Sequence, residues 1–523
     1  MKSPNPYLEQ VWAVLPRLLA LYDTNPLSPT YGMGDRYRWA WKLIDFGNGT
    51  FQGAAQGLAR LLKHNLLPNY LSQMAIERRI DALFRGADRL RYPNGSFEEA
   101  FPFESSFCVT ALVAYDLLTA IELLKAHLDL EVQTRYLDII RPAISFLHQA
   151  DESHAFISNH LATAAVALYK WSALTNEPGE KRGEEILERI LSEQSPEGWF
   201  REYEGADPGY QSLATYYLAD LHRLRPDLDL LDSLRRSIQF LWHFAHPDGS
   251  FGGYYGSRNT RFYYPAGLEA LAPEIPEAAS LAKFMGSSIQ NLTTVTLAVI
   301  DEPNLIPMFN AYCWAASLYE GTQEHNLEPS PELPALSNLL WRRQFPEAGL
   351  LIDKGTKHYT IVSWHKGGVC YHFPSETEKS WIDVGMVAIS PNGHYVSSQA
   401  YQAHNSMQLD GDILTVTAPL VAMHQQLPSL LQFIILRLLN VTIMRSLLLG
   451  NLVKKILVRL LITGQRVAPV SNRRTIHLGA NLNIKDSWKE EQGKGFNRIE
   501  VKYPFSAIHM ASQGYWQLQD DIR

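Results

Sequence analysis

Side chains that can move a proton or bind a carboxylate gather in a few short segments of this chain. Asn159 and His160 precede an Ala-rich stretch, and Tyr210 and Tyr216 lie in YQSLATYY. Tyrosine and histidine can act as general acids or bases, whereas amide and guanidinium groups hydrogen-bond carboxylates. These segments therefore suit proton transfer beside an acidic group. The remaining candidates are Arg258, Arg261 and His404, with Tyr255 and Tyr264 as ligand-stacking aromatics.

Each candidate also has a purely structural interpretation. Asn159 is a favoured N-cap residue, so the Asn-His pair can simply begin a helix. The tyrosines can be core or rim aromatics. Arg258 and Arg261 flank Asn259 in a Gly-rich loop, which favours exposure at the surface. His404 lies shortly before an Asp-Gly turn signal and can belong to a hairpin.

Acidic side chains offer a different chemistry. Two carboxylates about 5 Å apart, or about 6.5 to 9.5 Å apart, support retaining or inverting glycoside hydrolysis. The candidates in the same loops are Glu98, Glu99, Glu104, Glu202, Glu204 and Asp207. No phosphate-binding Gly-rich loop, HExxH motif or GxSxG motif occurs in the sequence, so nucleotide, zinc-protease and serine-hydrolase chemistry lack their main signals. We expect neither a metal nor another cofactor.

Composition limits the class of protein. The chain has 523 residues, 46% of them hydrophobic, which is enough to bury a large core and excludes a disordered chain. Its net charge of −7 argues against nonspecific binding to nucleic acid. The three cysteines are few and scattered, which is typical of a reducing compartment. The first residues contain Pro, Glu and Gln instead of an apolar run, so a cytoplasmic location is expected.

A repeat runs through the first part of the chain. Six times a polar or Gly-rich turn with an aromatic residue leads into a helix rich in Ala, Leu and Tyr; the copies begin at Asn48, Asn94, Phe156, Glu197, Asp248 and Pro307. Each copy reads as a pair of helices, which cannot bury both faces alone and must stack on its neighbours. Six copies favour a closed (α/α)6 toroid over residues 1–335. An open helical solenoid is the alternative.

The pattern then changes to β-strands. Segments such as HYTIVS, DILTVTA and RRTIHL alternate or run in β-branched and aromatic residues between polar turns. We therefore expect an antiparallel β-sandwich over residues 336–523. The segment EPSPELPAL, with Pro329, Pro331 and Pro334, is a plausible junction because proline resists both helix and sheet.

One segment of the second domain is strongly apolar and helical in pattern. Residues 427–462 carry Arg437, Arg445, Lys455 and Arg459 on one side of a helical wheel, with Lys454 set apart. Five cations make a membrane-spanning helix costly. Three interpretations remain: an amphipathic helix on a membrane surface, an oligomer contact, or a helical insertion packed on its own domain. The first predicts that the basic stripe contacts anionic lipid.

The combination of domains and motifs resembles the heparinase II/III-like polysaccharide lyases and their alginate-lyase relatives. The motifs are ISNHLATAA, the Tyr210 to Tyr217 segment and YQAHNSMQLDGD, in that order along the chain. Members of that family commonly have a Tyr-His pair within the tyrosine segment and an arginine before the third motif; this chain has neither.

The resemblance implies a lyase that cleaves an acidic, uronate-containing polysaccharide or oligosaccharide by β-elimination. An amide and an arginine would bind the uronate carboxylate, and a phenol and an imidazole would exchange the protons. The implied binding residues are Asn159, Arg258, Arg261, Tyr255 and Tyr264, and the implied catalytic residues are Tyr210, Tyr216, His160 and His404. Two alternatives stay open: a non-catalytic toroid that binds a glycan or a partner at a membrane surface, and a glycoside hydrolase or uronyl epimerase on the same scaffold.

Overall fold

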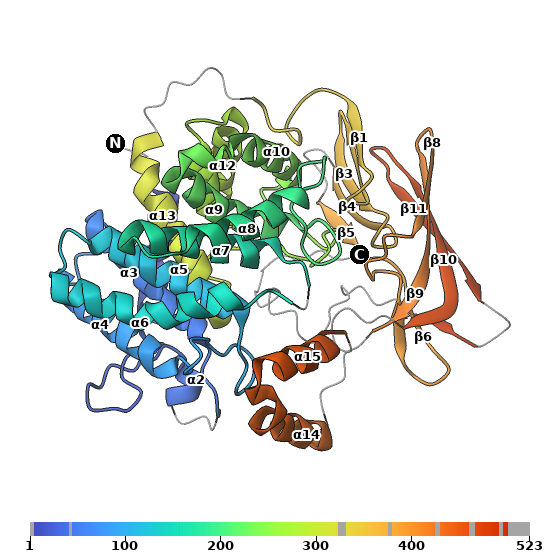
Figure 1. The fold of residues 1–523 in the computed structure, drawn as a ribbon. Helices are drawn as coiled ribbons and strands as arrows, with labels where there is room; N and C mark the ends of the chain where they lie inside the picture. The colour runs from blue at the N-terminus through green and yellow to red at the C-terminus, as the bar shows by residue number, and fades with distance from the viewer. Residues whose placement is uncertain are drawn as a thin grey trace.

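The helical half of the chain forms two rings in the computed structural model, which describes residues 5–40, 44–153, 155–322, 331–374, 379–423, 429–459, 466–490 and 495–499 (Figure 1). Consecutive helices of the inner ring contact each other, and the last of them contacts the first. The predicted toroid is therefore closed, and the open solenoid is excluded. The inner helices are α3 (Ala54–Lys63), α5 (Phe107–Leu124), α7 (Ser158–Thr175), α9 (Pro208–Leu224), α11 (Ala266–Leu271) and α13 (Glu302–Thr322).

The outer helices pack one apolar face on this ring. In α4, for example, the buried residues Ile76, Ile80 and Leu83 recur at helical spacing while polar side chains face outward. The short helix α2 (Arg36–Trp39) precedes the first inner helix. The outer ring consists of α1 (Pro6–Leu19), α4 (Gln73–Leu90), α6 (Leu130–Gln149), α8 (Glu180–Ser192), α10 (Leu231–Leu241) and α12 (Pro276–Gln290).

Inner helices are apolar on all sides because they are covered on all sides. Helix α5 is, within the described residues, the single helix long and apolar enough to cross a membrane, and 78% of that stretch is buried inside the toroid. Its first turn is capped by Ser106, whose hydroxyl accepts a hydrogen bond from the Val109 amide. In the preceding turn Gly95 has φ of +92°, and a Cβ there would meet the Pro142 carbonyl oxygen at 1.9 Å. The NGS signal of the repeat thus marks a turn that only glycine can make.

Two antiparallel sheets make up the second domain. One has the order β1-β2-β3-β4-β5, and the other has the order β11-β10-β9-β7-β6-β12 with β8 paired to β9. Leu351, Val362 and Cys370 of the first sheet pack on Leu414 and Ile476 of the second, so the pair is a sandwich. The strands are β1 (Trp341–Phe345), β2 (Leu350–Gly355), β3 (His358–Ser363), β4 (Val369–Pro374), β5 (Trp381–Asp383), β6 (Val387–Ile389), β7 (Tyr395–Ser397), β8 (Ser406–Asp410), β9 (Ile413–Ala422), β10 (Val467–His477), β11 (Asn483–Glu490) and β12 (Asn497–Ile499).

The five-stranded sheet lies against the toroid and the other sheet lies on its far side (Figure 1). The ring of Phe345 packs edge-on against Phe240 at 5.2 Å between centroids, and the Tyr359 hydroxyl donates to the His243 carbonyl oxygen at 2.6 Å. Apolar burial at this contact fixes the two domains relative to each other. Helix α13 ends at Thr322 and β1 begins at Trp341; Pro329 of the predicted junction and residues 500–523 lie outside the described residues.

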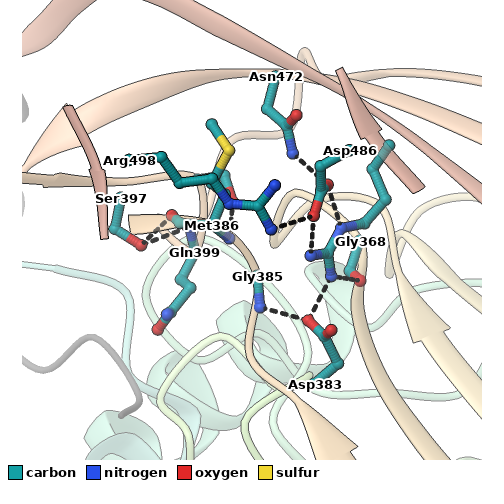
Figure 2. Close-up of polar contacts among 11 residues, drawn as sticks. Gly368, Asp383, Gly385, Met386, Ser397, Gln399, Asn472, Asp486 and Arg498 are labelled. Atoms are coloured by element: carbon teal, nitrogen blue, oxygen red, sulfur yellow. Dashed lines mark hydrogen bonds and ion pairs between the residues drawn. The ribbon is translucent and has the colours of Figure 1, made fainter. Parts of the chain in front are cut away.

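A buried arginine joins the two sheets of the sandwich. Arg474 on β10 is 2% exposed, and two of its nitrogens contact both carboxylate oxygens of Asp486 at 2.8 and 2.9 Å. It also pairs with Asp383 of β5, which accepts a hydrogen bond from the Gly385 amide (Figure 2). Burial alone would raise the pKa of Asp486, but the hydrogen bonds and charge of Arg474 outweigh it and lower that pKa.

The apolar segment expected as one amphipathic helix is two helices. Helix α14 (Leu430–Val441) is followed by a 3₁₀ turn, η4 (Ile443–Arg445), and by α15 (Leu447–Val458). The turn breaks the predicted basic stripe: the Arg437 guanidinium pairs with Asp45 at 3.0 Å and the Arg445 guanidinium lies 4.6 Å from the ring centroid of Phe103. The expected single basic stripe is therefore not continuous, because part of it contacts the toroid, and contact with anionic lipid stays a prediction.

Candidate active site

The candidate site lies where the inner helices begin, on the side of the toroid that meets the sandwich. Asn159 and His160 are in the first turn of α7, and Tyr210 is in the first turn of the neighbouring helix α9. The loops before α9 and α11 supply the acidic and basic residues, and the sandwich adds the turn between β3 and β4.

Asn159 holds a buried glutamate and does not cap its helix. The N-cap position is Ile157, and the Asn159 backbone and side-chain amides each donate to Glu202 at 3.0 Å. Glu202 has no exposed surface. Burial raises its pKa well above the usual range, against these two hydrogen bonds and with help from the charge of Asp207. Glu202 therefore favours its protonated form.

Asp207 ties the start of α9 to the arginine loop. One carboxylate oxygen accepts from the Tyr210 amide at 3.2 Å, and the other accepts from the Arg258 amide at 2.9 Å. The Thr260 hydroxyl also donates to this side chain. Burial raises the pKa of Asp207, although these donors oppose the shift. The carboxylate thus acts as an N-cap and as a clamp that fixes the loop at the mouth of the toroid.

The two predicted arginines are in this loop but are buried rather than exposed. The guanidinium carbon of Arg258 lies 3.9 Å from the ring centroid of Tyr203, and its Nε atom has no hydrogen-bond partner among the described residues. Arg261 lies over the ring of Tyr254, whose hydroxyl is 3.4 Å from one guanidinium nitrogen. Both arginines are 7% exposed. Stacking on aromatic faces holds guanidinium groups in fixed orientations.

Lys366 of the sandwich reaches into the same loop and was not among the predicted site residues. Its Nζ atom donates to the Asn259 side-chain oxygen at 2.6 Å, and the residue is 3% exposed. Burial lowers its pKa to about 7; Arg258 contributes, while Asp207 opposes the shift. A lysine with this pKa is neutral, and so able to accept a proton, in about half of the molecules at pH 7.

A sequence signal for Lys366 does exist. The segment WHKGG places it between two strands and directly before two glycines. Gly367 and Gly368 have φ of +67° and +86°, so the turn that presents the lysine needs residues without a side chain. Lysine in a short turn is usually a solvated residue, which is why the pattern alone did not single it out.

The two predicted histidines sit on different rims of the site. His404 is exposed in the loop between β7 and β8. The side-chain amide of the next residue, Asn405, donates to the Trp364 carbonyl oxygen at 2.9 Å. Burial and the nearby charge of His404 lower the pKa of His365 to about 4. His160 is half-buried on the toroid, with its Nδ1 atom 2.6 Å from a carboxylate oxygen of Glu152.

Three predicted tyrosines are inside the protein rather than at the mouth. Tyr216 is in the ring interior, where its hydroxyl accepts from Gln56 at 3.0 Å. Tyr255 is in the contact between the domains and bonds His246 at 2.8 Å. Tyr264 is buried too, and burial raises the pKa of all three phenols. A phenol with a raised pKa in the ring interior does not suit the catalytic role that the resemblance implied for Tyr216.

The arrangement thus unites part of the predicted set. Asn159, Tyr210 and Arg258 are joined through Glu202 and Asp207, and the sandwich brings its lysine to the same loop. Tyr210 is half-buried at this mouth, with its ring edge-on to Phe262 at 5.5 Å between centroids. The charge of Arg258 acts on the Lys366 amine, and the helix that carries the Tyr210 phenol is capped by the same Asp207 that holds the arginine loop.

No protein-family model and no curated protein matches the chain. Among solved structures, a Paenibacillus xanthan lyase matches with a TM-score of 0.47 and 11% identity over 80% of this chain, which spans 45% of that lyase. Heparinase III matches with a TM-score of 0.46 and 11% identity, covering 93% of this chain and 77% of its own. A cellobiose 2-epimerase from Bacillus thermoamylovorans has a TM-score of 0.44 and 10% identity, covering 61% of this chain and 100% of its own.

By their names, the structural neighbours include polysaccharide lyases and an epimerase. At these identities and TM-scores the likeness says nothing of the reaction. The fold rests on the closed ring and the two packed sheets of this chain itself, and the activity has to be argued from its own side chains.

Proposed function

We propose that the protein is a carbohydrate-active enzyme that cleaves an acidic, uronate-containing polysaccharide or oligosaccharide by β-elimination. The observation that carries this proposal is that Lys366 of the sandwich bonds Asn259 in the loop of Arg258, and that Asp207 joins this loop to the backbone amide of Tyr210 at the start of α9. β-Elimination beside a carboxylate needs a neutralising cation, a base and an acid. These three groups supply them.

In the proposed step, the guanidinium of Arg258 binds the uronate carboxylate and lowers the cost of forming an enolate at the neighbouring carbon. The neutral amine of Lys366 takes the C5 proton. The electron pair then forms the C4=C5 double bond as the C4–O bond breaks, and the Tyr210 phenol protonates the departing oxygen. The two products are a shortened sugar chain and an unsaturated sugar.

Uronate polymers such as heparan, chondroitin and alginate chains test the reaction, because the new double bond is conjugated with the carboxylate and absorbs in the ultraviolet. Lys366→Arg keeps the positive charge but cannot lose its proton at neutral pH, so activity should fall at least about 100-fold. Lys357→Arg changes an exposed lysine of the same domain and should retain full activity. The rate should rise with pH through about 7, where Lys366 becomes neutral.

Other outcomes separate the alternatives. Reducing ends without new absorbance mark a hydrolase, and inverted C5 without chain cleavage marks an epimerase. Binding on a glycan array without any product marks a non-catalytic carbohydrate-binding protein. Any of these three results, or full activity in Lys366→Arg, removes the lyase proposal.

We also propose that the helical insertion rests on a membrane surface. One side of the insertion contacts the toroid: the Lys454 amine pairs with the buried Glu104 at 2.7 Å. Lys455 and Arg459 stay exposed and can contact anionic headgroups. The exposed large apolar residues of the insertion are Leu430, Leu431, Phe433, Ile434, Ile435, Leu438, Val441, Ile443, Leu448, Leu449, Leu452 and Ile456. So many apolar side chains in one exposed segment are typical of an interfacial surface.

Flotation with phosphatidylserine-containing vesicles tests this surface. Ile434→Asp combined with Leu438→Asp should abolish flotation, because carboxylates cannot enter the acyl boundary. Leu339→Asp alters an equally exposed leucine outside the insertion and should float like the parent protein. Equal flotation of both variants would refute membrane docking. So would light scattering that shows a dimer for the parent protein and a monomer for the double variant, since the insertion would then be an oligomer contact.

A further inference from the structure

A cavity lies at the end of the toroid opposite the candidate site, where the inner helices finish. It measures about 350 Å³ and is bounded by the last turns of α3, α5 and α9 and by parts of α7 and α13. It shares no residue with the mouth that faces the sandwich. We call it the far-mouth pocket. Its volume is at the lower end of the range for small-molecule sites.

The charges around this pocket do not balance. Lys170 is already neutralised, since its Nζ atom lies 3.1 Å from Asp220 and also bonds Glu122. The pocket is further lined by Arg60, Lys63 and Arg223, and within the described part of the chain none of these three forms an ion pair with a carboxylate. The lining therefore has four cations against two carboxylates, which leaves a net positive charge of about two.

Arg60 is the most telling of these cations. It is 7% exposed, and its Nε atom is buried without a hydrogen-bond partner. Its guanidinium carbon lies 5.3 Å from the ring centroid of Trp314, and that of Arg223 lies 5.4 Å from the same ring. A buried guanidinium nitrogen without an acceptor is costly, so two arginines held by one indole are arranged for a ligand that supplies acceptor oxygens.

The surroundings support an anionic ligand. Burial and the charges of Arg60 and Lys63 lower the pKa of His64 at the rim, so this histidine is neutral at pH 7 and can donate or accept a hydrogen bond. Asp220 also lines the pocket, where it accepts a hydrogen bond from the Tyr115 hydroxyl at 2.9 Å and pairs with Lys170, so its charge is already offset. Cations on two helices, α3 and α9, favour a dianion over a single carboxylate.

We propose that the far-mouth pocket is a second binding site, for a small anion that carries a phosphate or sulfate group. Guanidinium pairs match the tetrahedral oxygens of such groups, and the indole and neighbouring leucines can cover an attached organic part. The site is independent of the proposed lyase reaction, since it is built from the other ends of the helices.

Calorimetric titration of the full chain at low ionic strength tests the site with three probes: inorganic phosphate, inorganic sulfate and a hexose 6-phosphate. Arg60→Gln should weaken binding at least about tenfold. Arg223→Gln removes an exposed cation from the rim of the pocket, so this variant should fold like the parent protein. It should also bind the probes more weakly than the parent does. Arg78→Gln, on the exposed side of α4, is the matched control and should bind like the parent protein.

Tighter binding of the hexose phosphate than of inorganic phosphate would identify an organic ester as the ligand, and equal binding would identify the free anion. No heat from any probe at about 10 mM would overturn the proposal, because a site weaker than that has no effect at ordinary anion concentrations. Unchanged affinity in Arg223→Gln together with Arg60→Gln would overturn it as well. Neither result bears on the ultraviolet assay of the lyase reaction.

Discussion

The buried amine of Lys366 makes the stability of the protein depend on pH in a way that its own substitution should remove. The pKa falls from 10.5 to about 7 on folding, chiefly through burial. Because the folded-state pKa is the lower one, the unfolded chain binds more protons between about pH 7 and 10.5, and stability rises with pH across that window. For this shift, the gain between pH 7 and pH 9 is about 2 kcal/mol.

Lys366→Met keeps the length of the side chain and removes the titration. Urea unfolding of both proteins at pH 7, 8 and 9 should show the parent gaining about 2 kcal/mol relative to the variant as the pH rises. Lys357→Met, at an exposed lysine in the turn between β2 and β3, should show no such trend. A difference between parent and Lys366→Met that stays constant within about 0.5 kcal/mol would refute the argument that this amine is buried and neutral.

Three further changes test the packing around the site and the sandwich. Asn159→Leu removes the side-chain hydrogen bond to Glu202 and leaves an apolar group beside that buried carboxyl. The free energy of unfolding in urea should therefore fall by about 1 to 3 kcal/mol. Arg474→Met removes the main cationic partner of Asp486 and the ion pair with the partly exposed Asp383, and should cost about 3 to 5 kcal/mol at pH 7. Since the pKa of Asp486 is lowered in the fold, this cost should shrink as the pH falls through the range in which that carboxyl is protonated. Phe345→Ala opens the contact between the domains and should cost about 3 to 5 kcal/mol, with a separate transition for each domain in calorimetry.

The ring of helices could be predicted because its signal is repeated. Most copies have a polar or Gly-rich turn before an inner helix, and Gly95 shows why that turn needs a glycine. Closure of the ring followed from the number of copies, since six pairs of helices bury their faces when the last contacts the first. The boundary between the two domains shows in the same way as a change of hydrophobic period from helix to strand.

The candidate site was harder to predict because it depends on contacts between distant segments. The sequence cannot show that Asn159 supports Glu202, a residue 43 positions later, or that Asn259 meets Lys366 across 107 positions. Residue type also misleads for tyrosine. Tyr210 lies at the mouth of the toroid, where a phenol can exchange protons, whereas Tyr216, about two turns further along the same helix, is a core residue. Burial, which sets the pKa, is a property of the fold as a whole.

The basic stripe of the insertion was misjudged for a related reason. A helical wheel assumes one continuous helix, but the turn at Ile443–Arg445 resets the direction of every later side chain. Lys454, which the wheel set apart from the stripe, is the residue that pairs with Glu104 of the toroid. A wheel drawn separately for each half would have been the better guide.

The insertion joins β9 and β10, which are direct neighbours in the outer sheet and pair from Val421 with Val467 onward. A hairpin turn of a few residues would connect these strands equally well, so nothing in the register depends on what lies between them. The two helices can therefore be excised and replaced by a short turn, while the ring of helices and the pairing of β9 with β10 stay the same.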